Sequence, residues 1–298
     1  MLVGAAALLA ATALTAPATA GSAGTYPDYV ALGDSYAAGA GVPKQSAGLC
    51  LRSDKNYGHL VAAALGSGGY RDVTCSAAKT ADLTEPQYDA FIKVNDAQLD
   101  AVSAGTDLVT VGIGGNDLGT SDLGVAEVIA ACIAGAAVNP LGTPCHDLYA
   151  DGHFDFATWS WTWGEDTLVK RIDAAAPQVA SALRQIKAKA PGAKVLVVGY
   201  PALLPDDERT CAFRQPVTVG DVAYLRGIVG KLNTMLAAAA AANGATYVDT
   251  YTPTKGHDIC SADPWVEGLL PASPAVPFHP NAAGEQAMAD AVLATLAK

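Results

Sequence analysis

The sequence predicts a three-layer α/β/α sandwich built around a parallel β-sheet. Short, nearly continuous apolar runs alternate along the chain with longer segments whose apolar residues recur every three or four positions. Continuous apolar runs are typical of strands that are buried on both faces, as in parallel sheets. Strands that alternate with helices indicate βαβ units with right-handed crossovers, which place helices on both faces of the sheet.

Five apolar runs are expected to be the strands, namely Tyr29–Leu32, Asp72–Thr74, Leu108–Ile113, Lys194–Val198 and Thr246–Val248. Three segments carry one apolar stripe at helical spacing and are expected to be helices: 168–186, 222–236 and 281–296. Proline disrupts a helix interior, so Pro177 is expected to kink or restart the first of them. Residues 139–165 are rich in glycine, proline and aromatic residues and are expected to form an insertion or a long loop.

The N-terminal segment is typical of an export signal. Residues 1–24 carry no charge, and their apolar run is followed by Pro17 and the small residues Ala18-Thr19-Ala20. The apolar run ends near Leu14, which is short of the roughly 20 residues that a membrane span needs. We therefore expect a signal peptide over 1–24 and one secreted domain over 25–298, without a membrane anchor after cleavage.

The charge and the cysteines narrow the class of protein further. A net charge of -11 repels phosphate backbones, so no nucleic-acid partner is expected. The even number of cysteines in an exported chain favours disulfides over metal ligation. Spacing does not choose among the fifteen possible pairings; our prediction is the sequential one, Cys50–Cys75, Cys132–Cys145 and Cys211–Cys260. The neighbours Cys145-His146 and His257…Cys260 match no structural zinc spacing, and no metal is expected.

The first chemically suggestive motif is Gly33-Asp34-Ser35-Tyr36, directly after the first expected strand. A serine at the carboxyl end of a buried strand stands at the rim of the sheet, where open α/β folds bind their ligands. Gly33 permits a tight exit from the strand. The alternative interpretation is an ordinary strand-to-helix turn in which Ser35 caps the helix.

A second motif, residues 112–117 with the sequence GIGGND, follows the central strand. Its glycines let the backbone approach a ligand, and the amide of Asn116 is suited to bind a developing oxyanion. A dinucleotide-binding loop would need a glycine where Asp117 stands, so that alternative is not favoured.

The third motif is Phe278-His279-Pro280-Asn281, shortly before the last expected helix. Of the five histidines, His279 is the best placed to act as a base. The chain has no G-x-S-x-G sequence, which excludes the nucleophile elbow of the α/β-hydrolase fold.

Taken in order, GDSY, GGND and HPN resemble blocks I, III and V of the SGNH (GDSL-type) hydrolase superfamily. The resemblance runs from Gly33 to Asn281 and is to secreted actinobacterial lipases and esterases of the Streptomyces type, which also share the cysteines and the stretches 257–260 and 265–269. It implies a flavodoxin-like fold with five parallel strands, and a serine ester hydrolase that needs no metal or organic cofactor.

The resemblance also implies roles for individual residues. Ser35 is expected to be the nucleophile and His279 its base. The oxyanion is expected to be held by the N–H of Ser35, the N–H of Ala77 and the side chain of Asn116. Ala77 stands where block II normally has glycine, but any residue other than proline keeps the N–H donor.

Like Ala77, the position three residues before His279 departs from the pattern of the superfamily. Val276 stands there, where a D-x-x-H motif has aspartate. In the related actinobacterial enzymes a main-chain carbonyl orients the histidine, so Val276 or Pro277 is expected to do so here. Asp258 and Asp263 are less favoured carboxylate alternatives. We therefore expect a Ser–His dyad rather than a triad.

The substrate is less sharply defined by the sequence. Lipid esters are expected from the resemblance, while phospholipid acyl hydrolysis and polysaccharide deacetylation fit the same residues. A non-catalytic secreted binding domain is the alternative of another class, although the intact Ser35, Asn116 and His279 argue against it. Trp159, Trp161 and Trp163 alternate with polar residues and suggest either a wall for acyl chains or, as we favour, packing of the insertion. A monomer with a small-molecule or lipid ester as its partner is expected.

Overall fold

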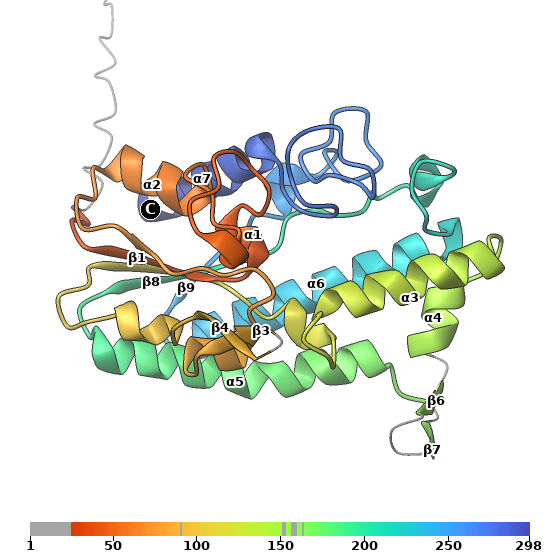
Figure 1. The fold of residues 1–298 in the computed structure, drawn as a ribbon, viewed down its shortest axis with the longest axis horizontal. Coiled ribbons are helices and arrows are strands. Elements are labelled where there is room, and N and C mark those ends of the chain that lie inside the picture. Colours follow the sequence, from red (N-terminus) through yellow and green to blue (C-terminus); the bar gives the residue numbers. More distant parts are fainter. Residues whose placement is uncertain (1–24, 90, 151–152, 156–159, 163) are drawn as a thin grey trace, which may run out of the picture.

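A five-stranded parallel sheet forms the middle layer of the molecule. The structure, a computed structural model, describes residues 25–89, 91–150, 153–155, 160–162 and 164–298. The strands lie in the order β2-β1-β5-β8-β9 (Figure 1), which is the flavodoxin-like order. Their bounds are β1 Tyr29–Gly33, β2 Arg71–Asp72, β5 Leu108–Gly112, β8 Lys194–Val198 and β9 Thr246–Val248. The predicted fold class is confirmed.

Helices cover both faces of this sheet. Helices α2 (Tyr57–Leu65) and α7 (Ala282–Leu296) lie together on one face, and α5 (Thr167–Lys189) and α6 (Val219–Ala242) lie on the other (Figure 1). Alternate residues of β1 pack into the two layers, with Val30 and Leu32 in one apolar cluster and Tyr29 and Ala31 in the other. Burial on both faces explains why the strand sequences are continuously apolar.

Two expected elements differ from the structure. The second strand ends at Asp72 rather than Thr74, because the Asp72 carboxylate accepts hydrogen bonds from the N–H and hydroxyl of Thr74 and turns the chain out of the sheet. Helix α5 continues through Pro177 without a restart. Pro177 lies on the exposed side of α5, so water can satisfy the carbonyl that loses its donor.

The remaining helices and strands lie outside this sheet. They are helices α1 (Ser35–Ala38), α3 (Val125–Val138) and α4 (Pro144–Tyr149), and the strand pairs β3 (Gln87–Asp89) with β4 (Ile92–Asn95) and β6 (His153–Asp155) with β7 (Ser160–Thr162). Thus the expected insertion at 139–165 contains α4 and a short hairpin. Trp159 and Trp163 lie outside the described residues, as does the side chain of Trp161. Among the described helices, none is long and apolar enough to cross a membrane.

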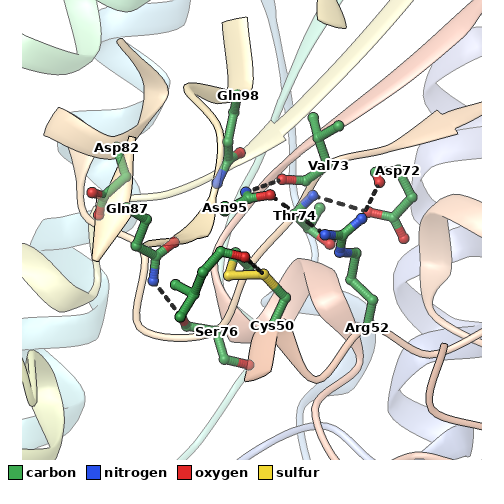
Figure 2. The surroundings of a disulfide bond; sticks show 12 residues. Cys50, Arg52, Asp72, Val73, Thr74, Ser76, Asp82, Gln87, Asn95 and Gln98 are labelled. Atoms are coloured by element: carbon green, nitrogen blue, oxygen red, sulfur yellow. Dashed lines mark hydrogen bonds between the residues drawn. A yellow bond between two sulfur atoms is a disulfide. The ribbon is translucent and has the colours of Figure 1, made fainter. Parts of the chain in front are cut away.

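The cysteines pair in sequence order, as predicted: Cys50–Cys75, Cys132–Cys145 and Cys211–Cys260. Figure 2 shows the surroundings of a disulfide, where Cys50 is labelled close to residues of the segment that follows β2. The second disulfide joins α3 to α4, and the third joins the segment before α6 to the loop that precedes α7. Because every cysteine is oxidised, none offers a thiolate to a zinc ion.

Removing the Cys50–Cys75 disulfide is expected to lower the free energy of unfolding. The bond closes a loop of 25 residues, for which loop-closure entropy predicts a loss of about 3.5 kcal/mol. The measurement is urea unfolding of Cys50→Ala/Cys75→Ala beside the unmodified protein. An unchanged unfolding midpoint would contradict the expectation.

Candidate active site

The backbone at the end of β1 places Ser35 at the carboxyl edge of the sheet. Gly33 has φ 148°, and a Cβ there would lie 2.4 Å from the carbonyl oxygen of Gly112, so only glycine fits. Asp34 then caps α1, because its carboxylate accepts a hydrogen bond of 2.9 Å from the N–H of Tyr36. Ser35 is the first residue of this short helix. The structure therefore contains the sharp turn that the sequence predicted around the serine.

His279 meets Ser35 across 244 positions of sequence. Its Nε2 lies 2.6 Å from the hydroxyl oxygen of Ser35. Its Nδ1 lies 2.8 Å from the carbonyl oxygen of Pro277, which can only accept a hydrogen bond. Nδ1 must then carry the proton, and Nε2 is left as an acceptor for the serine hydroxyl.

Of the two carbonyls expected to orient the imidazole, only that of Pro277 contacts the ring. The Val276 carbonyl instead accepts a hydrogen bond of 3.1 Å from the backbone N–H of His279, so the expectation for Val276 was wrong. Asp258 accepts a bond from the N–H of Cys260, and Asp263 lies beside His257. Within the described part of the chain, no carboxylate hydrogen-bonds to His279. The arrangement is the Ser–His pair without an acid that the sequence analysis anticipated.

The surroundings of His279 favour its neutral form. Burial lowers the pKa of His279, and the hydrogen bond to the Pro277 carbonyl only partly offsets this effect. The ring of Tyr36 lies 4.9 Å away, centroid to centroid. The Tyr36 hydroxyl also donates a hydrogen bond of 2.5 Å to the Phe278 carbonyl, which ties the histidine loop to α1. At neutral pH the imidazole is thus held unprotonated beside the hydroxyl.

The three expected oxyanion donors stand in the segments that follow three strands of the sheet, β1, β2 and β5. Over the described residues, the backbone N–H groups of Ser35 and Ala77 have no hydrogen-bond acceptor. The amide nitrogen of Asn116 donates to the Ala78 carbonyl at 3.1 Å, and its oxygen accepts from the N–H of Val125. A primary amide has two N–H bonds, so one remains for a ligand. Ser35 and Asn116 line the same small cavity, of about 60 Å³.

Ala77 adopts the left-handed backbone conformation, which favours glycine, with φ 63°. This conformation costs a residue with a Cβ roughly 1–2 kcal/mol, more than the roughly 0.5–1 kcal/mol of chain entropy that glycine loses. We expect Ala77→Gly to raise the free energy of unfolding by up to about 1 kcal/mol and to keep ester hydrolysis within about twofold.

A matched control for this substitution is Ala47→Gly. Ala47 has φ -145°, which any residue adopts, so glycine there should lower stability. Chemical denaturation and kcat/KM of both variants check the pair of expectations. A stability loss of equal size in the two variants would contradict the argument from Ala77.

Two side chains that the sequence analysis missed connect the loops of the site. The Tyr200 hydroxyl donates to the Asp34 carboxylate and accepts from the N–H of Gly115 at 2.7 Å, so it joins the turn of Ser35 to the loop of Asn116. The amide of Gln98 bonds both the N–H and the carbonyl of Gly33. Burial raises the pKa of Asp34 to about 7, although the Tyr200 bond opposes the shift.

An apolar cavity of about 150 Å³ adjoins the small cavity at Ser35, and the two share lining residues that include Tyr36, Leu118 and Val229. Its walls come from α3, α5, α6 and the loops around Leu203, Ile259 and Phe278. Two disulfides border it, since Cys132 lines the wall and Ile259 precedes Cys260. The serine therefore stands beside a space suited to a short hydrocarbon chain.

Comparison with known proteins identifies the family to which this chain belongs. The profile of the "GDSL-like Lipase/Acylhydrolase family" matches residues 31–287. The chain belongs to the GDSL-like lipase/acylhydrolase family. It is 42% identical to Lipase 2 of Streptomyces coelicolor over 288 residues, which cover 95% of this chain and 90% of that lipase. It is 34% identical to Lipase 1 of the same organism, covering 93% and 90% of the two chains.

Solved structures agree with this assignment. An extracellular lipase of Streptomyces rimosus superimposes with a TM-score of 0.68 at 28% identity, over 91% of this chain and 99% of the lipase. A phospholipase A1 of Streptomyces albidoflavus superimposes with a TM-score of 0.65, also at 28% identity, over 91% and 98%. The predicted superfamily is confirmed, and this GDSL-family chain is a carboxylic ester hydrolase of the lipase/esterase type.

Proposed function

We propose that the chain is a secreted lipase or esterase that hydrolyses medium-chain acyl esters through an acyl-enzyme on Ser35. The observation that carries this proposal is the hydrogen bond between His279 and Ser35, because Ser35 lines a small cavity that adjoins the apolar one. A serine hydroxyl is a weak nucleophile until an adjacent base takes its proton. His279 is positioned to be that base.

In the first half of the proposed reaction, His279 Nε2 takes the hydroxyl proton while the Ser35 oxygen attacks the ester carbonyl. The tetrahedral oxyanion accepts hydrogen bonds from the N–H groups of Ser35 and Ala77 and from the Asn116 amide. The imidazolium is steadied by the Pro277 carbonyl. His279 then gives the proton to the departing alcohol, and the acyl group remains on Ser35.

In the second half, water replaces the alcohol. His279 takes a proton from water as the water oxygen attacks the acyl-enzyme, and the same three donors hold the second oxyanion. Collapse returns the proton to the Ser35 oxygen and releases the carboxylic acid. Both halves use only groups of this chain and water.

The size of the apolar cavity supports acyl chains longer than acetyl. Its volume of about 150 Å³ equals that of an engineered apolar cavity that holds benzene, a molecule of six carbons. Each methylene that leaves water contributes about 0.8 kcal/mol, or roughly a fourfold gain in kcat/KM. An acetyl group would leave most of this space unfilled, so deacetylation of a polysaccharide is the weaker candidate.

Three observations support export of the chain. Residues 1–24 have the composition of a signal peptide. The six cysteines form three disulfides, which persist in oxidising compartments. The structurally similar lipase of Streptomyces rimosus is described as extracellular.

The test is a series of p-nitrophenyl esters from acetyl to dodecanoyl, with the purified protein and Ser35→Ala side by side. We expect kcat/KM to rise about fourfold per methylene up to about six carbons and then to level off. Ser35→Ala should show only background release of nitrophenol. Equal rates for the two proteins would overturn the proposal, and a maximum at acetyl would overturn its acyl-chain part.

The pH dependence of kcat/KM should follow His279. Because burial lowers the pKa of His279, the imidazole stays neutral at pH values below its usual pKa of about 6.5. The enzyme therefore loses activity only when the pH falls further. The acid limb for a hexanoyl ester is therefore expected to have its midpoint below pH 6.5. Asp34 titrates nearer to pH 7, so Asp34→Asn is the control: it should leave this midpoint in place. A midpoint above 7 that persists in Asp34→Asn would contradict the assignment.

A further inference from the structure

The histidine loop, residues 264–281, contains a buried carboxylate. Glu267 is 1% exposed, and its side chain is bound by neutral donors of the same loop. Its Oε1 accepts hydrogen bonds from the Ser273 hydroxyl at 2.5 Å and from the Asn281 amide at 2.8 Å, and its Oε2 accepts one of 2.7 Å from the N–H of Ala272. Such bonds are needed because a carboxylate is costly to keep away from water. The proposed reaction itself does not use this group.

Glu267 also pairs with the residues around His279 through its backbone. Its N–H donates to the His279 carbonyl at 2.9 Å, and its carbonyl accepts a hydrogen bond of 3.0 Å from the N–H of Phe278. Val266 and Pro280 form an antiparallel bridge beside them. This short antiparallel pairing fixes the backbone of Glu267 next to the histidine.

The turn between Pro277 and His279 depends on such support, because Phe278 has φ 64°. This left-handed conformation is unfavourable for a residue with a Cβ, and it persists only where the surroundings hold it. The Tyr36 hydroxyl binds the carbonyl of Phe278, and the Glu267 carbonyl binds its N–H. The turn directs the Pro277 carbonyl to Nδ1 of His279, so the shape of the turn decides where Nε2 points.

The carboxylate of Glu267 joins the two sides of the segment that carries His279. Ala272 and Ser273 precede this segment, and Asn281 follows it as the N-cap of α7. All three donate to the carboxylate, so the position suits a group that only accepts hydrogen bonds. Burial would raise the pKa of Glu267, but these hydrogen bonds outweigh burial and hold the pKa below its usual value. Glu267 is therefore ionised at neutral pH.

We propose that Glu267 is a positioning residue of the Ser–His dyad. Its carboxylate fixes the histidine loop so that the Pro277 carbonyl stays on Nδ1 of His279 and Nε2 stays on the serine. In a catalytic triad an aspartate orients the histidine by a direct hydrogen bond. Within the described part of the chain the Glu267 carboxylate makes no hydrogen bond to the imidazole, so it acts through the backbone. The proposal rests on the proposed function, because it assumes that Ser35 and His279 cleave the ester.

The test variant is Glu267→Gln, which keeps the size of the side chain and replaces one acceptor oxygen with a donor. At least one of the three hydrogen bonds is then lost, because the new N–H₂ group faces another donor. We expect kcat for a hexanoyl ester to fall about 10–100-fold, since a small misplacement of a catalytic group has an effect of this size. KM should stay within about threefold, because Phe278 is the only described lining residue of the apolar cavity that belongs to the histidine loop.

A second readout reports on the imidazole itself. ¹⁵N NMR of the histidine side chains distinguishes a proton held on Nδ1 from one shared between both ring nitrogens, and the signals of His279 are those missing from His279→Ala. At neutral pH the unmodified protein should keep the proton on Nδ1. In Glu267→Gln we expect a mixture of both tautomers, because the Pro277 carbonyl no longer holds the ring.

The matched control is Asp221→Asn. Asp221 is likewise 1% exposed. Its carboxylate accepts hydrogen bonds from the N–H groups of Cys145 and His146 and from the Thr218 hydroxyl. These bonds join α4 to the start of α6 and do not involve the histidine loop. The variant should be less stable in urea, whereas its kcat and the tautomer of His279 should not change.

Ser273→Ala is a milder variant that serves if Glu267→Gln does not fold. It removes one of the three donors to the carboxylate and should lower kcat by about threefold.

The outcomes separate the positioning role from the reaction. An unchanged kcat in a folded variant of Glu267 or Ser273 would overturn the positioning role and leave the esterase function standing. A proton that stays on Nδ1 in a slowed Glu267→Gln would do the same. A loss of kcat of equal size in Asp221→Asn would attribute the effect to stability and overturn the role as well. Hydrolysis by Ser35→Ala at the rate of the unmodified protein would instead overturn the proposed function.

Discussion

Replacing Ser35 with alanine is expected to lower kcat for hexanoyl ester hydrolysis by about 10⁴-fold or more, because the acyl group loses its covalent attachment point. His279→Ala should lose a similar factor, since the hydroxyl then has no base. The two residues act as one unit through their 2.6 Å hydrogen bond. The double variant should therefore be about as slow as either single variant.

The measurement is kcat for the three variants at one pH, with circular dichroism to verify folding. His257→Ala is a matched control, because His257 is another loop histidine whose ring nitrogen lies 2.8 Å from a carbonyl oxygen, that of Asp263. That variant should keep kcat within a few-fold. Losses that multiply in the double variant, rather than coincide, would contradict a shared role for Ser35 and His279.

Asn116→Ala is expected to lower kcat by about 10²–10³-fold with little change in KM, which is the usual effect of losing one oxyanion donor. The reason is that the amide binds the charge that develops in the transition state more strongly than the ground-state carbonyl. Its other contacts, to Ala78 and Val125, hold the loop, so part of any stability loss has a structural origin.

Two comparisons isolate the catalytic part of the Asn116 effect. Thermal unfolding reports the structural part directly. Asn243→Ala, at the C-terminal end of α6, removes an amide that bonds the Ala239 carbonyl far from Ser35, and it should leave kcat unchanged. A change in KM alone for Asn116→Ala, with kcat preserved, would contradict the oxyanion role.

The sheet was predictable because each strand is marked by an apolar run within a few consecutive residues. Runs such as Leu108–Gly112 and Lys194–Val198 are nearly continuous in apolar residues over a short length, which is typical of strands buried on both faces. The second strand was predicted too far along the chain, because the turn is made by two hydrogen bonds from Thr74 to the Asp72 side chain, which apolar patterning does not show. A restart of the helix at Pro177 was wrong, because periodicity does not show whether the freed carbonyl faces water.

The candidate site was predictable to a different degree. Ser35, Asn116 and His279 stand in short motifs that resemble one superfamily, and the family assignment follows from them. The contacts that support these residues were not predictable. Tyr200 binds Asp34, from which it is 166 positions away in the sequence, and Gln98 binds Gly33, from which it is 65 positions away. No local pattern marks a tyrosine or a glutamine for such a contact. The choice between the Val276 and Pro277 carbonyls likewise depended on the ring orientation of His279.

The central claim is that the oxygen of Ser35 becomes covalently attached to the acyl group with the help of His279. The most direct test is to treat the protein with a p-nitrophenyl hexylphosphonate ester, digest it and map the adduct by mass spectrometry. The account predicts one phosphonyl group per chain, on Ser35, formed quickly in the unmodified protein and at a negligible rate in His279→Ala. A stable adduct on any other residue, or equally fast labelling of Ser35 without His279, would contradict it.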